Sequence, residues 1–321
     1  MDIINFSDHF PHKDKFLDTF YSKLKRLDPQ GENDYSYTKL IFEEVSDTLE
    51  DMRKADCNKG TFGTLGCVVG SYGMAGAAML CTSAACCSGA GIVKTILPDK
   101  IYPIVSSNVW ESVFVPCNTS NDGTLCADDT DKIIKELEVC SAVVAGCGLK
   151  VTKDTEYLIC EILKRCKAPV ILDADGINCI AKHIDVLKER SYPTIITPHP
   201  GEMSRLCGKT VEEIQKDRIN VAKDFASEYG CIVVLKGMGT IIHDGRNGSV
   251  NRTGTGALAT AGTGDVLSGI IGAFVCQKID CLKAAVAGVC LHGLCADFLS
   301  DTYSLAGTTA SDLITVLKIL T

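Results

Sequence analysis

The feature that most constrains this fold is an alternation, from about Ala55 onward, of short apolar runs with longer helical stretches. The apolar runs are LGCVVG, SAVVAGCG, APVILDADG, YPTIITPHP, CIVVLKG and GTIIHDG. The helices expected among them cover residues 74–88, 154–167, 211–229, 264–276, 282–299 and 311–320. Short apolar strands separated by helices are typical of a mostly parallel sheet with both faces covered. The pattern therefore predicts an α/β fold of three layers.

Residues 1–54 have a different character. They are charged and aromatic, contain little glycine, and show helical spacing in DKFLDTFYSKLKRL and YTKLIFEEVSDTLEDM. We expect a helical N-terminal extension over residues 1–54 and a single α/β domain over residues 55–321.

Charge and cysteine content narrow the function. The net charge is −8 without a basic block, so we expect no binding to nucleic acid. The 18 cysteines lie in apolar stretches without C-x-x-C spacing, and the chain starts with charged, polar residues rather than a secretory signal. This usage predicts small, buried, reduced core residues in a cytoplasmic protein. The uncharged segment 60–93 is broken by glycines and rich in small residues, so we expect no membrane helix there. The many small residues are compatible with a homo-oligomer.

Polar residues follow the apolar runs at the positions where strands should end. Ligands gather beyond the carboxyl ends of the strands in sheets of this kind. We therefore expect one shared cleft, built from residues 146–148, 173–178, 197–202, 236–240 and 262–265.

The turn AGTGD is the best candidate site. Gly262, Thr263 and Gly264 precede an apolar helix, whose free N–H groups and positive dipole end would face an anion. Asp265 on the first turn could take a proton from a hydroxyl that attacks a phosphoryl group. The simpler interpretation is a carboxylate that only caps the helix or interacts favourably with its dipole.

Three further loops are less specific. Lys236 directly follows an apolar run and could reach a phosphate as a point charge, or lie in solvent. His199, held between two prolines, could donate to a substrate, while Glu202 could lie near a metal or cap the next helix; a plain turn is the alternative. Asp173 and Asp175 should point to opposite faces, so we do not expect them to chelate one ion together.

Other motifs have simpler interpretations. His292 lies in an apolar helix, and we expect a core histidine with one hydrogen bond. The glycines of GEMSRLCGKT are too far apart for a P-loop, and no stretch completes G-x-G-x-x-G after a strand. The sequence identifies no metal ligands.

Taken in order, several stretches resemble the ADP/ATP-dependent NAD(P)H-hydrate dehydratase family, a branch of the ribokinase-like fold. They are NKGTFGTLGCVVGSYGMAGAAMLC, SGAGIV, AGCGL, VILDADGIN, TPHPGEMSRL, VVLKG, NRTGTGALATAGTGDVLSGII and HG. The resemblance implies a three-layer ribokinase-like sandwich. It also implies repair of hydrated NADH or NADPH: ADP or ATP with Mg²⁺ phosphorylates the ring hydroxyl, and elimination of phosphate follows. ADP is the preferred donor.

The resemblance also implies residue roles. Asp265 would be the base, and Gly262, Thr263 and Gly264 the anion hole. The implied substrate contacts are Ala77, Gly148, His199 and Asp265. The implied nucleotide contacts are Lys236, Gly237, Met238, Gly239, Thr240 and Gly264.

The chain departs from the family pattern in one loop. The family commonly has Thr-Gly-Asn-Pro-Gly-Met where this chain reads TGTGAL (253–258), and Ala261 replaces a usual glycine. The family's frequent epimerase partner is expected to be a separate protein, because 54 residues are too few for it.

Two alternative functions remain open. One is a ribokinase-like kinase of a sugar or vitamin precursor, and the other is an inactive nucleotide-binding protein.

Overall fold

The computed structural model describes residues 35–300 and 303–320, so the helix expected in DKFLDTFYSKLKRL lies outside the described residues. A nine-stranded sheet forms the middle layer, in the order β3-β2-β1-β4-β5-β6-β7-β8-β9. Its first seven strands run parallel, and β8 and β9 are antiparallel. The strands are β1 (Thr64–Val68), β2 (Ile92–Pro98), β3 (Val113–Cys117), β4 (Ala142–Ala145), β5 (Val170–Leu172), β6 (Thr194–Ile196), β7 (Ile232–Leu235), β8 (Ile241–His243) and β9 (Gly248–Val250).

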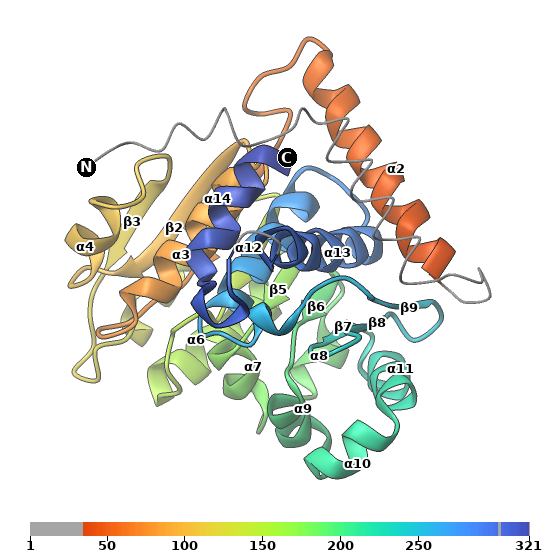
Figure 1. The fold of residues 1–321 in the computed structure, drawn as a ribbon. Coiled ribbons are helices and arrows are strands. Elements are labelled where there is room, and N and C mark those ends of the chain that lie inside the picture. Colours follow the sequence, from red (N-terminus) through yellow and green to blue (C-terminus); the bar gives the residue numbers. More distant parts are fainter. Residues whose placement is uncertain (1–34, 301–302, 321) are drawn as a thin grey trace.

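Helices cover both faces of this sheet (Figure 1). One face packs against α2 (Tyr35–Lys54), α3 (Ala75–Cys87), α4 (Tyr102–Ser106), α12 (Thr263–Cys276), α13 (Cys281–Ser300) and α14 (Ala310–Leu320). The other face packs against α5 (Thr130–Leu137), α6 (Lys153–Arg165), α7 (Asp175–Ile180), α8 (Val186–Glu189), α9 (Pro200–Cys207), α10 (Val211–Lys216) and α11 (Arg218–Tyr229). Neighbouring strand residues alternate between the two cores, as Val143 and Val144 do. The predicted three-layer α/β fold is confirmed.

Differences from the sequence prediction fall at strands and at helices, and the prediction did not include α4, α5, α7 and α8. The prediction missed β2, β3 and β9; β3 is an edge strand that contains a proline, and β9 has three residues. The single helix expected over residues 211–229 was wrong, because Asp217 leaves helical geometry and its carboxylate accepts from the N–H of Asn220, which starts α11 anew.

The N-terminal helix α2 belongs to the packed structure. Ile41 and Val45 are buried in the first core, and the hydroxyls of Thr38 and Ser249 bond at 2.5 Å. Helix α2 therefore packs on α13 and the β9 edge (Figure 1).

Helix α13 is, among the described residues, long and apolar enough to cross a membrane, but 78% of its apolar window is buried inside the protein. It packs against α2, α12 and α14, as a core helix does. The uncharged segment 60–93 forms β1, α3 and the start of β2 instead of a membrane helix.

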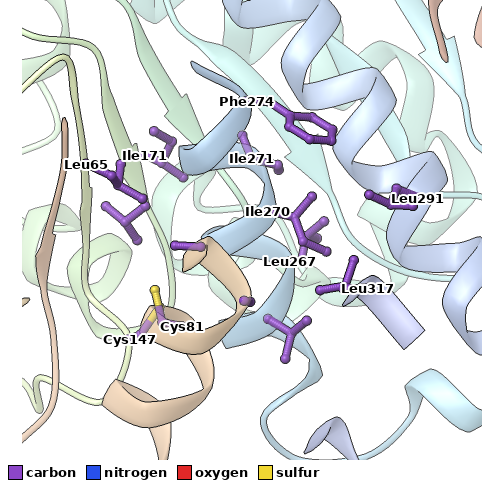
Figure 2. Close-up of a cluster of buried hydrophobic side chains, with 14 of the residues drawn as sticks. Leu65, Cys81, Cys147, Ile171, Leu267, Ile270, Ile271, Phe274, Leu291 and Leu317 are labelled. Carbon is purple, nitrogen blue, oxygen red and sulfur yellow. The ribbon is translucent and has the colours of Figure 1, made fainter. Parts of the chain in front are cut away.

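Helix α12 lies between the sheet and the outer helices, as Figure 2 shows with Leu267, Ile270 and Phe274. A Cβ on Gly269 would lie 2.4 Å from the Cys81 carbonyl oxygen of α3, and one on Gly272 would lie 2.4 Å from the side chain of Val144 in β4. Only glycine permits these approaches, so they fix the position of α12. Its first turn consequently lies beyond the carboxyl ends of β4 and β5.

Candidate active site

The site begins at the first turn of α12. Gly262 is the residue before the helix, with φ of +91°, a conformation that favours glycine. The Thr263 hydroxyl turns back to donate to the carbonyls of Leu258 and Thr260, at 2.9 and 3.0 Å. Any anion hole here therefore uses backbone N–H groups rather than this hydroxyl. The first N–H groups of a helix lack acceptors within it, which leaves this end open to an anion.

Asp265 is the third residue of α12, and no side chain caps this helix. The residue before the helix is a glycine, so no side chain there caps it, but Asp265 lies in the first turn, where the alternative of a favourable interaction with the helix dipole stays open. Burial and the negative charge of Asp173 raise the pKa of Asp265 to about 7, while the Cys147 thiol and the Lys236 ammonium oppose that rise. A carboxylate with a pKa near neutrality suits a general base.

Lys236 follows β7, and its side chain contacts residues that follow β5 and β6. Its ammonium lies 2.7 Å from Asp173 Oδ1, and 4.0 Å from Glu202 Oε2. Burial raises the pKa of Asp173, but Lys236 and a hydrogen bond from Thr197 outweigh it and hold the pKa below its ordinary value. A Cβ placed on Gly264 would lie 3.4 Å from the Lys236 nitrogen, so this cation faces the first turn of α12.

His199 caps α9. Its Nδ1 accepts from the N–H groups of Gly201 and Glu202, and its side chain is half exposed at 51%. The Glu202 carboxylate accepts from the N–H of His199 at 2.8 Å, which completes a reciprocal cap. With Nδ1 accepting, Nε2 carries the proton, and it lies 3.4 Å from Glu202 Oε1.

Ala77 and Gly148 lie together, next to Cys147. A Cβ on Gly148, whose φ is +65°, would lie 2.8 Å from the Ala77 Cβ. The Ser71 hydroxyl donates to the Gly148 carbonyl at 2.8 Å and fixes this loop. The structure thus places both predicted substrate contacts beside Cys147.

The predicted nucleotide loop extends from β7 to β8. Met238 is fully exposed, and the Thr240 hydroxyl donates to the Gly237 carbonyl at 3.0 Å. Arg218, which the sequence analysis did not single out, donates to the carbonyls of Leu235 and Met238. Arg218 therefore supports the loop from α11, while Lys236 alone extends into the carboxylate cluster.

The altered loop 253–258 is held by α13. The Gly254 N–H donates to the Asp297 carboxylate, and the Thr253 hydroxyl donates to the Cys290 carbonyl at 3.0 Å. These contacts keep the loop ordered without the asparagine and proline of the family pattern.

His292 on α13 lies behind the first turn of α12. It is buried, hydrogen-bonds to the backbone of Thr263, and has no partner for Nε2. Burial lowers the pKa of His292 to about 4. The predicted core histidine with one hydrogen bond is confirmed.

The sequence analysis missed the role of Cys147. It is fully buried between the carboxylates of Asp173 and Asp265, whereas the sequence suggested an ordinary core thiol. Asp175 points elsewhere and accepts from the N–H of Lys150 at 2.8 Å, so the two aspartates of ILDADG serve different loops, as expected. The signal for Cys147 was its place between two glycines directly after a strand.

The three-layer arrangement is the ribokinase-like fold. A ribokinase-like superfamily protein of Enterococcus faecalis shares this fold, with a TM-score of 0.72 over 85% of this chain and 92% of that one at 24% identity. This likeness shows the fold alone.

The sequence match goes further, because the family model for NAD(P)H-hydrate dehydratases covers residues 65–318. The chain belongs to that family. The ADP-dependent (S)-NAD(P)H-hydrate dehydratase of Neisseria meningitidis is 35% identical over 79% of this chain and 83% of the relative. The ADP/ATP-dependent dehydratase of Bacillus subtilis, co-crystallised with ATP and Mg²⁺, is 31% identical, with a TM-score of 0.71 over 86% of this chain and 95% of that one.

Several curated relatives are bifunctional repair enzymes, and the chain spans about half of their length.

Proposed function

We propose that this protein dehydrates hydrated NADH or NADPH with ADP or ATP as phosphodonor. The observation that supports the proposal best is Asp265, a carboxylate with a pKa near 7 at the open first turn of α12, beside the Lys236 ammonium. A base, an anion-binding helix end and a cation in one cleft are what transfer of a phosphoryl group to an alcohol requires.

Asp265 and the residues around it have different roles in the proposed reaction. Asp265 takes the proton of the ring hydroxyl as the hydroxyl oxygen attacks the terminal phosphoryl group. With ADP this gives the phosphorylated ring and AMP. The electron pair of the ring nitrogen then expels phosphate from the adjacent carbon. Loss of a proton from the next ring carbon to solvent forms the carbon–carbon double bond and returns the electron pair to nitrogen. Ala77, Gly148 and His199 hold the nicotinamide side, and Lys236, Gly264 and residues 237–240 hold the nucleotide.

Mg²⁺ would be brought mainly by the nucleotide. Within residues 35–300 and 303–320, the one group of three possible ligands contains a thiol, which a hard cation disfavours. Mg²⁺ usually keeps several waters and is shared with substrate phosphates, where it neutralises their charge. The relatives' names support both nucleotides, and we retain ADP as the preferred donor.

Recovery of the reduced nicotinamide ring tests the function directly. Hydrated NADH, Mg²⁺ and either ADP or ATP are mixed with the protein, and the near-ultraviolet band of NADH is followed. A rise with ADP is expected. A rise only with ATP reverses the donor preference, whereas a stable phosphorylated product without NADH identifies a kinase. Nucleotide binding without turnover identifies an inactive binder.

The pH dependence of kcat/KM for the repair reaction should follow the ionisation of Asp265. Because the base must be ionised and its pKa is about 7, kcat/KM should fall about tenfold per pH unit below that value. The Cys147 hydrogen bond lowers this pKa, so Cys147→Ala should move the inflection to higher pH. The variant is compared with wild type at each pH. Effects of pH on the substrate itself are the same for both proteins and therefore cancel. An unchanged inflection would count against the thiol's influence on the base.

Lys236→Ala should weaken ADP binding by removing the cation that faces Gly264. The same change leaves buried Asp173 without its ion-pair partner, so stability should also fall. ADP affinity measured by calorimetry on protein shown to be folded separates the two effects. Unchanged affinity in folded protein would remove Lys236 from the nucleotide site.

We further propose that residues 55–321 form the catalytic domain with 1–54 as an extension, and that the protein acts in the cytoplasm as a homo-oligomer. These remain predictions from composition and the resemblance.

A further inference from the structure

Cys147, Asp173 and Asp265 lie close together and form a group of three possible metal ligands. Each offers one ligand atom, and the three atoms lie within 4.8 Å of one another. They come from the loop after β4, the end of β5 and the first turn of α12. Cys147 and Asp173 are buried, with 0% and 1% exposure, and Asp265 is partly buried. The group is therefore held by the core and opens to the cleft at Asp265.

The Cys147 thiol lies beside the carboxylates of Asp173 and Asp265. Lys236 and Thr197 both bond to Oδ1 of Asp173, each at 2.7 Å. The other oxygen, Oδ2, lies 3.7 Å from Cys147 Sγ and accepts from its thiol. The same thiol is within hydrogen-bonding reach of Asp265. The Cys147 thiol thus lies among two carboxylates and the Cys81 thiol, and of the two carboxylates Asp173 is already paired with Lys236.

The charges around this thiol are unbalanced. Asp173, Asp265 and Glu202 bring three carboxylates to the cleft, and Lys236 brings one ammonium. If the thiol is deprotonated, the group of Cys147, Asp173, Asp265 and Lys236 carries a charge of −2. A divalent cation restores neutrality in a place where water cannot screen the charges.

The distances suit one class of cation. Zinc binds thiolate sulfur at about 2.3 Å and carboxylate oxygen at about 2.0 Å, so a tetrahedral ion separates S and O by roughly 3.5 Å. The observed Sγ···Oδ2 distance of 3.7 Å is close to that edge. A sulfur ligand favours zinc-class ions over Mg²⁺. Three protein ligands also leave the fourth position of a tetrahedral ion for a water molecule.

We propose that Cys147, Asp173 and Asp265 form a binding site for a thiophilic divalent cation such as Zn²⁺, and that the bound ion blocks Asp265 as a base. On binding, the metal–sulfur bond replaces the S–H bond, and the proton is released to solvent. The ion then occupies the Asp265 oxygen that would accept the substrate proton. Zinc-class ions thus inhibit an enzyme whose nucleotide brings Mg²⁺.

Cd²⁺ tests the site without any turnover, because a cadmium–thiolate bond has its own ultraviolet charge-transfer band. Wild type should bind one Cd²⁺ more per chain than Cys147→Ala, with a stronger band, and Mg²⁺ should not displace it. Cys276→Ala is the matched control, because Cys276 is a buried thiol at the far end of the same helix α12. Cd²⁺ should also raise the Tm of wild type and Cys276→Ala more than that of Cys147→Ala.

Asp265→Asn provides a second variant if Cys147→Ala does not fold. It keeps the thiol and removes one oxygen ligand, so Cd²⁺ affinity should fall by at least about tenfold, the loss typical of disturbed metal sites. Equal Cd²⁺ stoichiometry and affinity in wild type and folded variants would overturn the site. These readouts need no substrate, so they succeed or fail separately from the repair reaction. In the repair assay, Zn²⁺ should inhibit wild type at concentrations at least about tenfold below those needed for Cys147→Ala, each measured against its own uninhibited rate.

Discussion

Asp265→Asn should lower turnover of hydrated NADH by at least about a hundredfold, the range typical of a lost general base. Asparagine has nearly the same shape, but it cannot accept the proton of the ring hydroxyl. The variant should still bind nucleotide, because Lys236 and the first turn of α12 remain in place. Steady-state kinetics with ADP and with ATP would measure the loss, and Asp131→Asn, on a highly exposed carboxylate of α5, is the control.

Stability separates this loss from a folding defect. The pKa of Asp265 in the folded protein lies above its ordinary value, so the folded state binds more protons than the unfolded state between about pH 4 and pH 7. Ionisation of Asp265 therefore opposes folding above that range, and Asp265→Asn should be at least as stable as wild type at pH 8. Turnover within a few-fold of wild type would remove Asp265 from the mechanism.

The strands and helices that form the cleft were predictable because their apolar runs are continuous. Strands buried on both faces show such runs, as IVVL in β7 does. The missed strand β2 contains Lys94, whose stem is buried while its ammonium bonds to Glu136 at 2.8 Å, so its pattern is broken. Edge strand β3 has exposed residues on both faces and no clear alternation.

The position of the site was predictable from topology, but its electrostatics were not. Placing polar residues after strands identified the loops of Asp173, His199, Lys236 and Asp265. Which carboxylate pairs with Lys236 depends on tertiary distances of a few ångströms, and the sequence left Asp173 and Asp175 equivalent in this respect. The thiol of Cys147 looked like the other core cysteines because hydrophobic context alone cannot show a neighbour more than 20 residues away.

Gly146→Ala should destabilise the protein more than any surface change, because Gly146 joins the two loops that carry Cys147 and Asp173. Its φ is +128°, and a Cβ there would lie 1.9 Å from the Asp173 carbonyl oxygen and 2.7 Å from the Gly176 nitrogen. Both obstacles are backbone atoms, and the Asp173 N–H is already bonded to the Ala145 carbonyl at 3.2 Å. A side chain must therefore push the ends of β4 and β5 apart. Backbone strain costs about 1–3 kcal/mol and overpacking about the same again, so unfolding free energy should fall by about 3 kcal/mol or more.

Gly76→Ala is the matched control for that measurement. Gly76 lies in α3 with no atom within 4 Å of an added Cβ, so alanine should cost nothing and add about 0.5–1 kcal/mol of helix stability. Urea denaturation of both variants gives the comparison. Because the displaced loops position the Cys147 thiol and Asp173, which both affect the pKa of Asp265, Gly146→Ala should also shift the acidic inflection of the pH–rate profile. A Gly146→Ala protein as stable as wild type would mean that β4 and β5 separate more easily than their packing suggests, and the close approach of Cys147 to Asp173 would then not be fixed by the backbone.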